Sequence, residues 1–297
     1  MIHYEHCPVC RAINIADKFV VKDYTVSGEE YMLQECDSCS FVFTQDIPSA
    51  DEIGKYYASQ NYISHSNTQK GLINSLYHRV RKITLASKRK LIITQTGLPK
   101  GKLLDVGCGT GAFLNEMKAA RWEITGLEPD ETARKNAREL FGIEASPSQA
   151  LFQLQPESYD AITMWHVMEH VHQLHEYVAQ LKLLLKPGGR IFIAVPNYTS
   201  YDAQHYQRFW AAYDVPRHLY HFSPPSMQLL MEKHGLQLLN TKPMWFDSFY
   251  VSMLSEQYKN DGKGNIIGAF FTGLMSNIKA LTNKDRCSSV IYIIGKQ

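Results

Sequence analysis

From residue 101 onward, short apolar runs alternate with segments whose apolar residues recur at helical spacing. Four runs predict buried strands, namely KLLDVG (102–107), EITGLEPD (123–130), YDAITMWHV (159–167) and RIFIAVPN (190–197). The spacing between them predicts helices over 112–121, over 131–141 and in the segment that ends at 185, with a turn at KPGG (186–189). Because strands and helices alternate, we expect an α/β fold built on a doubly wound, mostly parallel sheet.

The first 48 residues follow a different pattern. The runs FVVKDYTV (19–26) and EEYMLQE (29–35) predict a hairpin. Two C-x2-C pairs flank this hairpin: Cys7, Cys10, Cys36 and Cys39. Paired thiolates on facing loops give the tetrahedral sulfur coordination of a structural Zn(II) site, and a module of about 40 residues needs such a staple. We therefore interpret residues 1–48 as a zinc ribbon, with free cysteines in a small hairpin as the alternative.

The segment 49–99 is polar with helical spacing, and we interpret it as a helical linker and substrate cap. It contains Tyr56, Tyr57 and Tyr62, followed by the basic run HRVRKITLASKRK (78–90). Glycine and proline then break the chain before the main domain. That domain covers 100–297, with an aromatic loop at 196–222 and a helical insertion at 247–283.

The composition narrows the class of protein. With 297 residues, of which 44% are hydrophobic, the chain can bury one large core and a smaller one. The net charge of +2 gives no global attraction to nucleic acid. Six cysteines are too few for a disulfide scaffold. No stretch reaches the roughly 20 apolar residues of a membrane span, so we expect a cytoplasmic protein.

The first strand of the main domain leads into a glycine-rich turn, LLDVGCGTG (103–111). Gly107, Gly109 and Gly111 follow Asp105 as G-x-G-x-G, which differs from the G-x-G-x-x-G of dinucleotide-binding loops. An acid at this point repels phosphate but attracts a cation, and S-adenosylmethionine (SAM) carries a sulfonium and an ammonium group. The next strand ends near Glu128, where a carboxylate can accept hydrogen bonds from both ribose hydroxyls.

Together with YDAITMWHVMEHV (159–171) and LKPGGRIFIAVPN (185–197), these blocks resemble the class I SAM-dependent methyltransferases over residues 101–195. The resemblance implies a Rossmann-like sheet of seven strands whose last strand is antiparallel, and CSSVIYIIGK (287–296) suits that strand. It further implies a set of cofactor-binding residues: Asp105, Gly107, Gly109, Gly111, Glu128, Ser146 and Trp165.

Candidate acceptor residues follow the later strands. His166, Glu169 and His170 form H-x-x-E-H, which resembles the E-x-x-E-H of ubiquinone-type and small-RNA 2′-O-methyltransferases, where acids and histidines hold a divalent metal. In the RNA enzymes a later histidine completes the site, and PRHLYHFSP, with His218 and His221, resembles that segment. A histidine in place of the first glutamate disfavours Mg(II).

The catalytic candidates are therefore His166, His170 and His221. Three roles stay open for them: a general base, ligands of a divalent metal together with Glu169, and a structural role. The aromatic loop around the last histidine is dense in Tyr, Trp and His. Such a loop either binds a planar or sugar-like acceptor or packs as a lid.

We expect a methyltransferase that moves the methyl group of SAM to a hydroxyl of a small molecule or saccharide precursor. An RNA methyltransferase that holds RNA with the zinc ribbon and the basic helix 78–90 is the alternative, less suited to the small net charge. A SAM-binding regulatory protein is the alternative that is not an enzyme.

One apolar stripe near the C-terminus belongs to none of these sites. It falls at helical spacing on Ile267, Phe271, Leu274, Ile278 and Leu281. We interpret it as core or as a homodimer contact, in preference to a lid for a lipid-linked acceptor.

Overall fold

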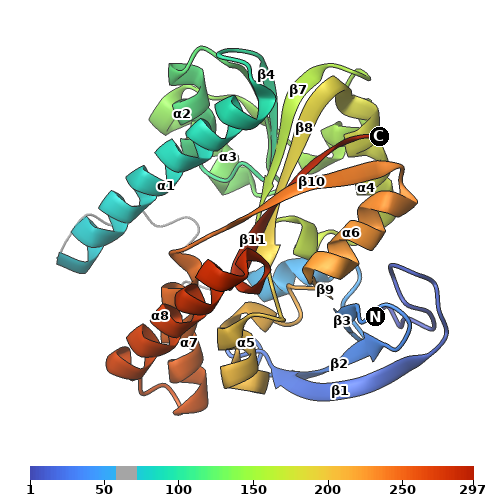
Figure 1. Cartoon of the computed structure of the whole chain (residues 1–297), viewed down its shortest axis with the longest axis vertical. Coiled ribbons are helices and arrows are strands. Elements are labelled where there is room, and N and C mark those ends of the chain that lie inside the picture. Colours follow the sequence, from blue (N-terminus) through green and yellow to red (C-terminus); the bar gives the residue numbers. More distant parts are fainter. Residues whose placement is uncertain (58–71) are drawn as a thin grey trace. The chain divides into compact units, whose positions relative to one another are not determined.

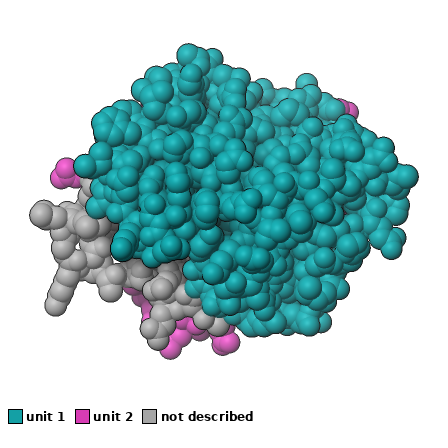
Figure 2. Space-filling view, turned by 90° about the horizontal axis from the view of Figure 1, so that it is seen from below, with its two compact units in different colours: residues 1–62, 168–174, 194–293 teal, residues 63–167, 175–193, 294–297 magenta. Residues whose placement is uncertain are grey.

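The computed structural model describes residues 1–57 and 72–297, with side chains from residue 79 onward in the second range. Tyr62 of the expected cap segment lies outside the described residues. The chain divides into two compact units, coloured teal and magenta in Figure 2. Unit 1 comprises residues 1–62, 168–174 and 194–293, and unit 2 comprises residues 63–167, 175–193 and 294–297.

The central element is a seven-stranded sheet in the order β10-β11-β8-β7-β4-β5-β6 (Figure 1). Its strands are β4 (Lys102–Val106), β5 (Glu123–Leu127), β6 (Ala145–Ser146), β7 (Tyr159–Trp165), β8 (Leu185–Pro196), β10 (Leu236–Pro243) and β11 (Ser289–Lys296). Strand β4 pairs in parallel with both β5 and β7, and β5 pairs in parallel with β6. The expected doubly wound, mostly parallel α/β sheet is confirmed, and the predicted C-terminal strand lies between β8 and β10.

The helices of unit 2 follow the predicted pattern closely. They are α1 (Leu72–Thr96), α2 (Ala112–Ala119), α3 (Glu131–Phe141) and α4 (Leu174–Leu184), with the short helix η3 (Ser148–Gln153). The turn expected at 186–189 was wrong, because this segment forms the start of β8. The N–H groups of Glu157 and Ser158 donate to the carbonyls of Leu183 and Leu184, which draws the chain into the sheet before the glycines.

Unit 1 contains a second sheet, in the order β1-β2-β3-β9. Its strands are β1 (Ile15–Lys22), β2 (Glu30–Cys36), β3 (Val42–Thr44) and β9 (Tyr220–His221). The predicted hairpin is formed by β1 and β2, with Val21 opposite Tyr31. Strand β9 comes from the aromatic loop and pairs antiparallel with β3. The N-terminal ribbon and the aromatic loop are therefore parts of one sheet.

The other elements of unit 1 are helical. They are η1 (Ile53–Tyr57), η4 (Met168–His170), α5 (Tyr201–Tyr206), η5 (Gln207–Phe209), η6 (Ala211–Tyr213), α6 (Pro224–Lys233), α7 (Asp247–Lys259), α8 (Ile266–Thr282) and η7 (Lys284–Arg286). The rings of Tyr206, Trp210 and Tyr213 pack with β1–β3 residues in one buried cluster. Tyr220 and Phe222 are buried as well. These five rings therefore pack in the interior, which agrees with the interpretation of the aromatic loop as a packed segment.

A buried arginine joins three segments of unit 1. Arg217, which is 1% exposed, directs Nη2 to Asp23 Oδ1 at 3.1 Å and to Asp214 Oδ1 at 2.6 Å. Its Nε donates to Asp214 Oδ2, and its Nη1 donates to the carbonyl of Tyr56. Asp23 in turn accepts the N–H groups of the turn between β1 and β2, including that of Thr25 at 2.9 Å.

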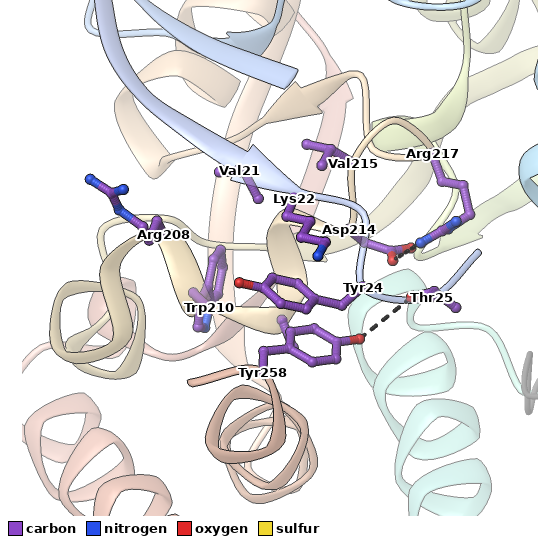
Figure 3. Close-up of a pocket in the computed structure, with 11 residues that line it drawn as sticks. Val21, Lys22, Tyr24, Thr25, Arg208, Trp210, Asp214, Val215, Arg217 and Tyr258 are labelled. Carbon is purple, nitrogen blue, oxygen red and sulfur yellow. Dashed lines mark hydrogen bonds and ion pairs between the residues drawn. The ribbon is translucent and has the colours of Figure 1, made fainter. Parts of the chain in front are cut away.

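Figure 3 shows this arginine and Asp214 beside a small cavity of about 10 Å³. Tyr24 and Tyr258 close the cavity with stacked rings whose centroids are 4.4 Å apart. The volume suffices for about one water molecule. Burial opposes ionisation of Asp214, but hydrogen bonding to Arg217 and its charge lower the pKa of that carboxyl below its usual value. The arginine and both aspartates are therefore charged together in the interior.

Replacing Arg217 by methionine should destabilise the protein strongly. Removal of one partner leaves the carboxylates of Asp23 and Asp214 uncompensated, which costs about 3–5 kcal/mol of unfolding free energy. Urea denaturation followed by tryptophan fluorescence measures this loss. Arg286→Met, at an exposed position, is the control and should change the unfolding free energy by less than about 0.5 kcal/mol. Equal losses of unfolding free energy in the two variants would contradict the stabilising role of the buried Arg217.

Candidate functional site

The turn after β4 is closed on one side and open on the other. Gly107, Gly109 and Gly111 have φ values of 74°, 54° and 77°, in the left-handed region that favours glycine. A Cβ atom at Gly107 would lie 2.4 Å from Cγ2 of Val167. A Cβ atom at Gly109 would meet no atom within 4 Å. The backbone at Gly109 is therefore accessible to a ligand.

Glu128 connects this turn to the loops that follow the next two strands. Its Oε2 accepts the N–H of Gly109 at 2.8 Å, and its Oε1 accepts the N–H of Asp130 at 3.0 Å. The N–H of Glu128 donates to the carbonyl of Ser146 at 2.9 Å. The carboxyl ends of three parallel strands thus meet at one point, as expected for a doubly wound sheet. The structure brings these predicted residues together within unit 2.

Asp105 is a second, more deeply buried acid in this unit. It is 1% exposed, and Thr163 Oγ1 donates to its Oδ1 at 2.5 Å. Burial raises the pKa of Asp105 to about 7, although the hydrogen bond from Thr163 and the charge of Lys88 act in the opposite direction. A bound cation would favour the ionised carboxylate. Two acids around a glycine turn fit the sulfonium and ammonium groups of SAM.

Trp165 and Lys88 lie together in this unit as well. The Nζ of Lys88, from α1, lies 4.1 Å from the ring centroid of Trp165, a cation–π contact. The indole Nε1 of Trp165 is buried with no hydrogen-bond partner among the residues that the structure describes. The sequence did not single out Lys88 for this site, because the residue lies in a run of basic positions that the sequence pattern does not distinguish from one another.

A cluster of one acid and two histidines lies in unit 1. Ligand atoms of Glu169, His170 and His218 all lie within 4.8 Å of one another. The imidazole rings pack edge to face with centroids 4.6 Å apart. The N–H of Leu219 donates to the carbonyl of Glu169 at 2.8 Å, which fixes the two segments to each other.

Hydrogen bonds fix the tautomers of both histidines. Nδ1 of His170 lies 2.9 Å from the carbonyl of Arg217, and Nδ1 of His218 lies 2.8 Å from the carbonyl of Ala212. A carbonyl can only accept, so each Nδ1 carries a proton and each neutral ring presents a lone pair at Nε2. Burial, with a smaller contribution from His218, lowers the pKa of His170 to about 4. At neutral pH His170 is therefore uncharged, with Nε2 as base or ligand.

The structure does not bring all predicted histidines into this cluster. His221 is buried in β9, where its Nε2 lies 3.1 Å from Thr44 Oγ1 of β3. Burial lowers the pKa of His221 well below its usual value. His166 belongs to unit 2 and follows β7 with φ 58°, an unfavourable backbone conformation for histidine. The resemblance to the RNA enzymes named His218 and His221 together, and only tertiary contacts distinguish them.

The four N-terminal cysteines form a compact cluster. The sulfurs of Cys7 and Cys39 are 3.6 Å apart, and those of Cys10 and Cys36 are 3.4 Å apart. All four thiols are free, and their sulfurs lie within 4.8 Å of one another. Disulfides require about 2.05 Å, whereas sulfurs around tetrahedral Zn(II) lie about 3.8 Å apart for bonds of about 2.3 Å. The donor set and spacing fit a structural zinc site in an N-terminal ribbon.

The two C-x2-C loops also share one backbone conformation. The N–H of Arg11 donates to the carbonyl of Cys7, and the N–H of Ser40 donates to the carbonyl of Cys36. Arg11 and Ser40 both adopt positive φ, at 69° and 53°. Equivalent turns place each pair of thiols at the tip of a loop, so the backbone itself is preorganised for four sulfur ligands.

Comparisons with known proteins show the family and the fold of this chain. The sequence profile of the family described as "Methyltransferase domain" matches residues 77–241, more than half of the chain, and the chain belongs to this family. A SAM-dependent methyltransferase from Archaeoglobus fulgidus has the same fold, with a TM-score of 0.50, 20% identity and coverage of 73% of this chain and 94% of that one. The predicted class I SAM-dependent methyltransferase fold and family are confirmed.

Curated relatives match a shorter part of the chain. The ubiquinone biosynthesis O-methyltransferase of Bordetella bronchiseptica is 35% identical over 112 residues, which is 35% of this chain and 46% of that protein. The enzyme of the same name from Yersinia pestis is 31% identical over 128 residues, which is 40% of this chain and 51% of that protein. The chain thus spans about half the length of the curated relatives it matches.

Replacing Cys36 by serine should remove zinc and unfold the ribbon, because three thiolates no longer close the tetrahedral site. Elemental analysis should find one zinc per wild-type chain and a large loss in the variant. SAM binding, measured by calorimetry, should persist, since the candidate SAM residues lie in unit 2. The control is Cys287→Ser, a buried cysteine outside the cluster, which should retain zinc. A wild-type protein without zinc would refute the assignment.

Proposed function

We propose that this protein is an enzyme that transfers the methyl group of SAM to a hydroxyl of a small molecule or saccharide precursor. The observation that carries the proposal is the cluster of Glu169, His170 and His218, in which each imidazole directs Nδ1 to a backbone carbonyl and leaves Nε2 available beside a carboxylate. A hydroxyl must lose a proton as it accepts a methyl group, and an unprotonated imidazole nitrogen can receive that proton.

The proposed binding of the methyl donor depends on loop residues of unit 2. Asp105, Gly109 and Glu128 would hold SAM, with the accessible backbone of Gly109 toward the methionine part and Glu128 toward the ribose. SAM supplies an activated methyl group. The methyl carbon bonds to the acceptor oxygen as its bond to sulfur breaks, S-adenosylhomocysteine leaves, and the hydroxyl proton passes to the base.

Chain connectivity supports placing the acceptor near the cluster. Glu169 and His170 follow the end of β7 by only four and five residues, and β7 neighbours β4, which leads to the donor turn. Ligands of open α/β sheets bind beyond the carboxyl ends of the strands, near the change in strand order. The curated relatives named as O-methyltransferases support a hydroxyl acceptor.

The same cluster offers a second version of the mechanism, with a bound divalent metal. One carboxylate and two imidazoles are a donor set for Zn(II), Fe(II) or Mn(II). The structure supports this version through the spacing of the ligand atoms and the low pKa of His170, which avoids competition from protons. His218 would then complete the ligand set. For His166 and His221, the catalytic role stays a prediction.

An RNA acceptor finds less support in the contacts of the basic helix. Lys88 packs on Trp165, and Arg89 pairs with Glu116 at 2.6 Å. Two of the expected phosphate-binding cations therefore already have partners within the protein. RNA remains the alternative acceptor, and the transfer experiment below decides between the two.

Replacing Glu128 by alanine should weaken SAM binding by about 1–3 kcal/mol, because the hydrogen bonds to the ribose are lost. Isothermal titration calorimetry measures the affinity. The control is Glu131→Ala, an exposed acid at the start of α3, which should bind SAM as the wild type does. Unchanged affinity of Glu128→Ala would refute the role of this residue.

Replacing His170 or His218 by asparagine should lower kcat by about 10²–10⁴-fold while SAM affinity stays unchanged. Asparagine can keep the hydrogen bond that each Nδ1 makes to a carbonyl, but it removes Nε2. The control is His205→Asn, an exposed histidine of α5, for which full activity is expected. Wild-type kcat in both cluster variants would exclude the cluster from catalysis.

The experiment that tests the proposal is transfer of a labelled methyl group from SAM into fractionated cell extract. We expect label in the small-molecule or saccharide fraction. Label in RNA that is lost at high salt would overturn the proposed acceptor and favour the RNA alternative. SAM binding without transfer into any fraction would indicate a SAM-binding regulatory protein.

A further inference from the structure

The helices α7 and α8 carry a large apolar surface that the described residues do not cover. Among the residues that the structure describes, 20 large apolar side chains are exposed, and 11 of them lie between residues 245 and 281. They are Trp245, Phe246, Tyr250, Met253, Ile266, Ile267, Phe270, Phe271, Met275, Ile278 and Leu281. The stripe expected to be core is therefore mostly exposed, which corrects that part of the sequence interpretation.

Nine of these residues lie on the two helices, two of them on α7 and seven on α8, and Trp245 and Phe246 precede α7. On α8, Ile267, Phe271 and Ile278 follow helical spacing and are 72%, 60% and 43% exposed. Phe249 of α7 stacks on Phe270 of α8, with ring centroids 5.6 Å apart, and so joins the apolar faces of the two helices. A contiguous apolar surface of this kind on a folded protein marks an interaction site.

The buried faces of the two helices consist mainly of small side chains. The buried residues of α7 and α8 include Ser248, Ser252, Ser255, Ala269, Thr272, Gly273 and Ser276. A Cβ atom at Gly273 would lie 3.0 Å from Cα of Phe249, so glycine permits the close approach. Figure 1 shows the two helices side by side as a hairpin. Helices that contact lipid likewise pack through small residues and direct large apolar residues outward.

The charges around this hairpin have one sign. Between residues 245 and 286, the exposed charged residues are five cations and one anion. The cations are Lys259, Lys263, Lys279, Lys284 and Arg286, and the anion is Asp261. A basic border around an apolar helical face matches the headgroups of anionic phospholipids. A second copy of the chain would instead bring two basic borders together, which is unfavourable.

We propose that the α7–α8 hairpin docks this protein onto the surface of an anionic phospholipid bilayer. Large apolar side chains of the hairpin enter the boundary between headgroups and acyl chains, and its lysines contact lipid phosphates. Along the described part of the chain, no helix has the length and apolarity to cross a bilayer, and the proposed mode is interfacial. The proposal does not depend on the proposed methyl transfer.

Sedimentation with vesicles tests the proposal directly. The full chain should bind vesicles of phosphatidylcholine with phosphatidylglycerol and bind pure phosphatidylcholine much more weakly, with binding reduced by high salt. The double variant Ile267→Ser/Phe271→Ser should lower the affinity by at least about tenfold. Its control is Leu140→Ser/Leu183→Ser, two apolar residues of unit 2 that are 49% and 48% exposed, and it should bind as the wild type does.

A charge-reversal variant tests the basic border separately. Lys259→Glu/Lys263→Glu/Lys279→Glu should lower binding to the anionic vesicles by at least about tenfold. The control reverses three exposed lysines elsewhere, Lys100, Lys118 and Lys135, and should lower it less. Circular dichroism and thermal unfolding verify that each variant is folded.

Three results would overturn the proposal. The first is absence of binding to anionic vesicles, and the second is an equal loss of vesicle affinity in the test and control variants. The third is a wild-type protein that binds no vesicles but forms a dimer in sedimentation velocity, where Ile267→Ser/Phe271→Ser is a monomer. None of these readouts measures methyl transfer, so failure of this proposal is separate from failure of the proposed function.

Discussion

The organisation of unit 1 depends on the buried charge of Arg217. A guanidinium in the interior is stable only when carboxylates and carbonyls surround it, and here they come from the ribbon turn, the residue three positions earlier and Tyr56. The carbonyl of the same arginine accepts the proton of His170 Nδ1, and the next residue is His218. The residue that carries this buried cation therefore links the ribbon and the aromatic loop and orients the imidazole of His170.

This arrangement makes the ribbon a support for the histidine segment. Strand β9 extends the ribbon sheet, and Thr44 Oγ1 of β3 donates to the carbonyl of His218 at 2.8 Å. The cysteine cluster lies beside the same strands, because Cys36 ends β2 and Phe41 begins the segment that leads to β3. Metal binding at the cysteines would thus stabilise the segment that carries the histidines, without any zinc ligand taking part in the reaction.

Each compact unit carries a different kind of chemistry. In unit 2, the ends of three parallel strands hold a buried acid, an accessible glycine and Glu128, a constellation for a cationic nucleoside. In unit 1, histidines and a carboxylate lie in segments inserted after β7 and β8. The α7–α8 hairpin adds an outward apolar face to unit 1. The methyltransferase domain carries the residues proposed to hold the donor, and the insertions carry the features proposed to contact the acceptor and the membrane.

The sequence by itself determined the βα alternation, the glycine turn with its two acids, and the paired cysteines, because these features depend on periodicity and on neighbours close along the chain. Only the tertiary structure decided which histidine joins Glu169 and His170. His218 and His221 are three residues apart, and a contact with Thr44, 177 residues before His221, separates their roles. Helical spacing likewise identified the apolar stripe on α8, but it could not show whether that stripe is buried or exposed. The buried face of α8 consists of small residues, with Gly273 against Phe249 of α7 and Ser276 against Asp202 of α5, and the large residues therefore remain outside.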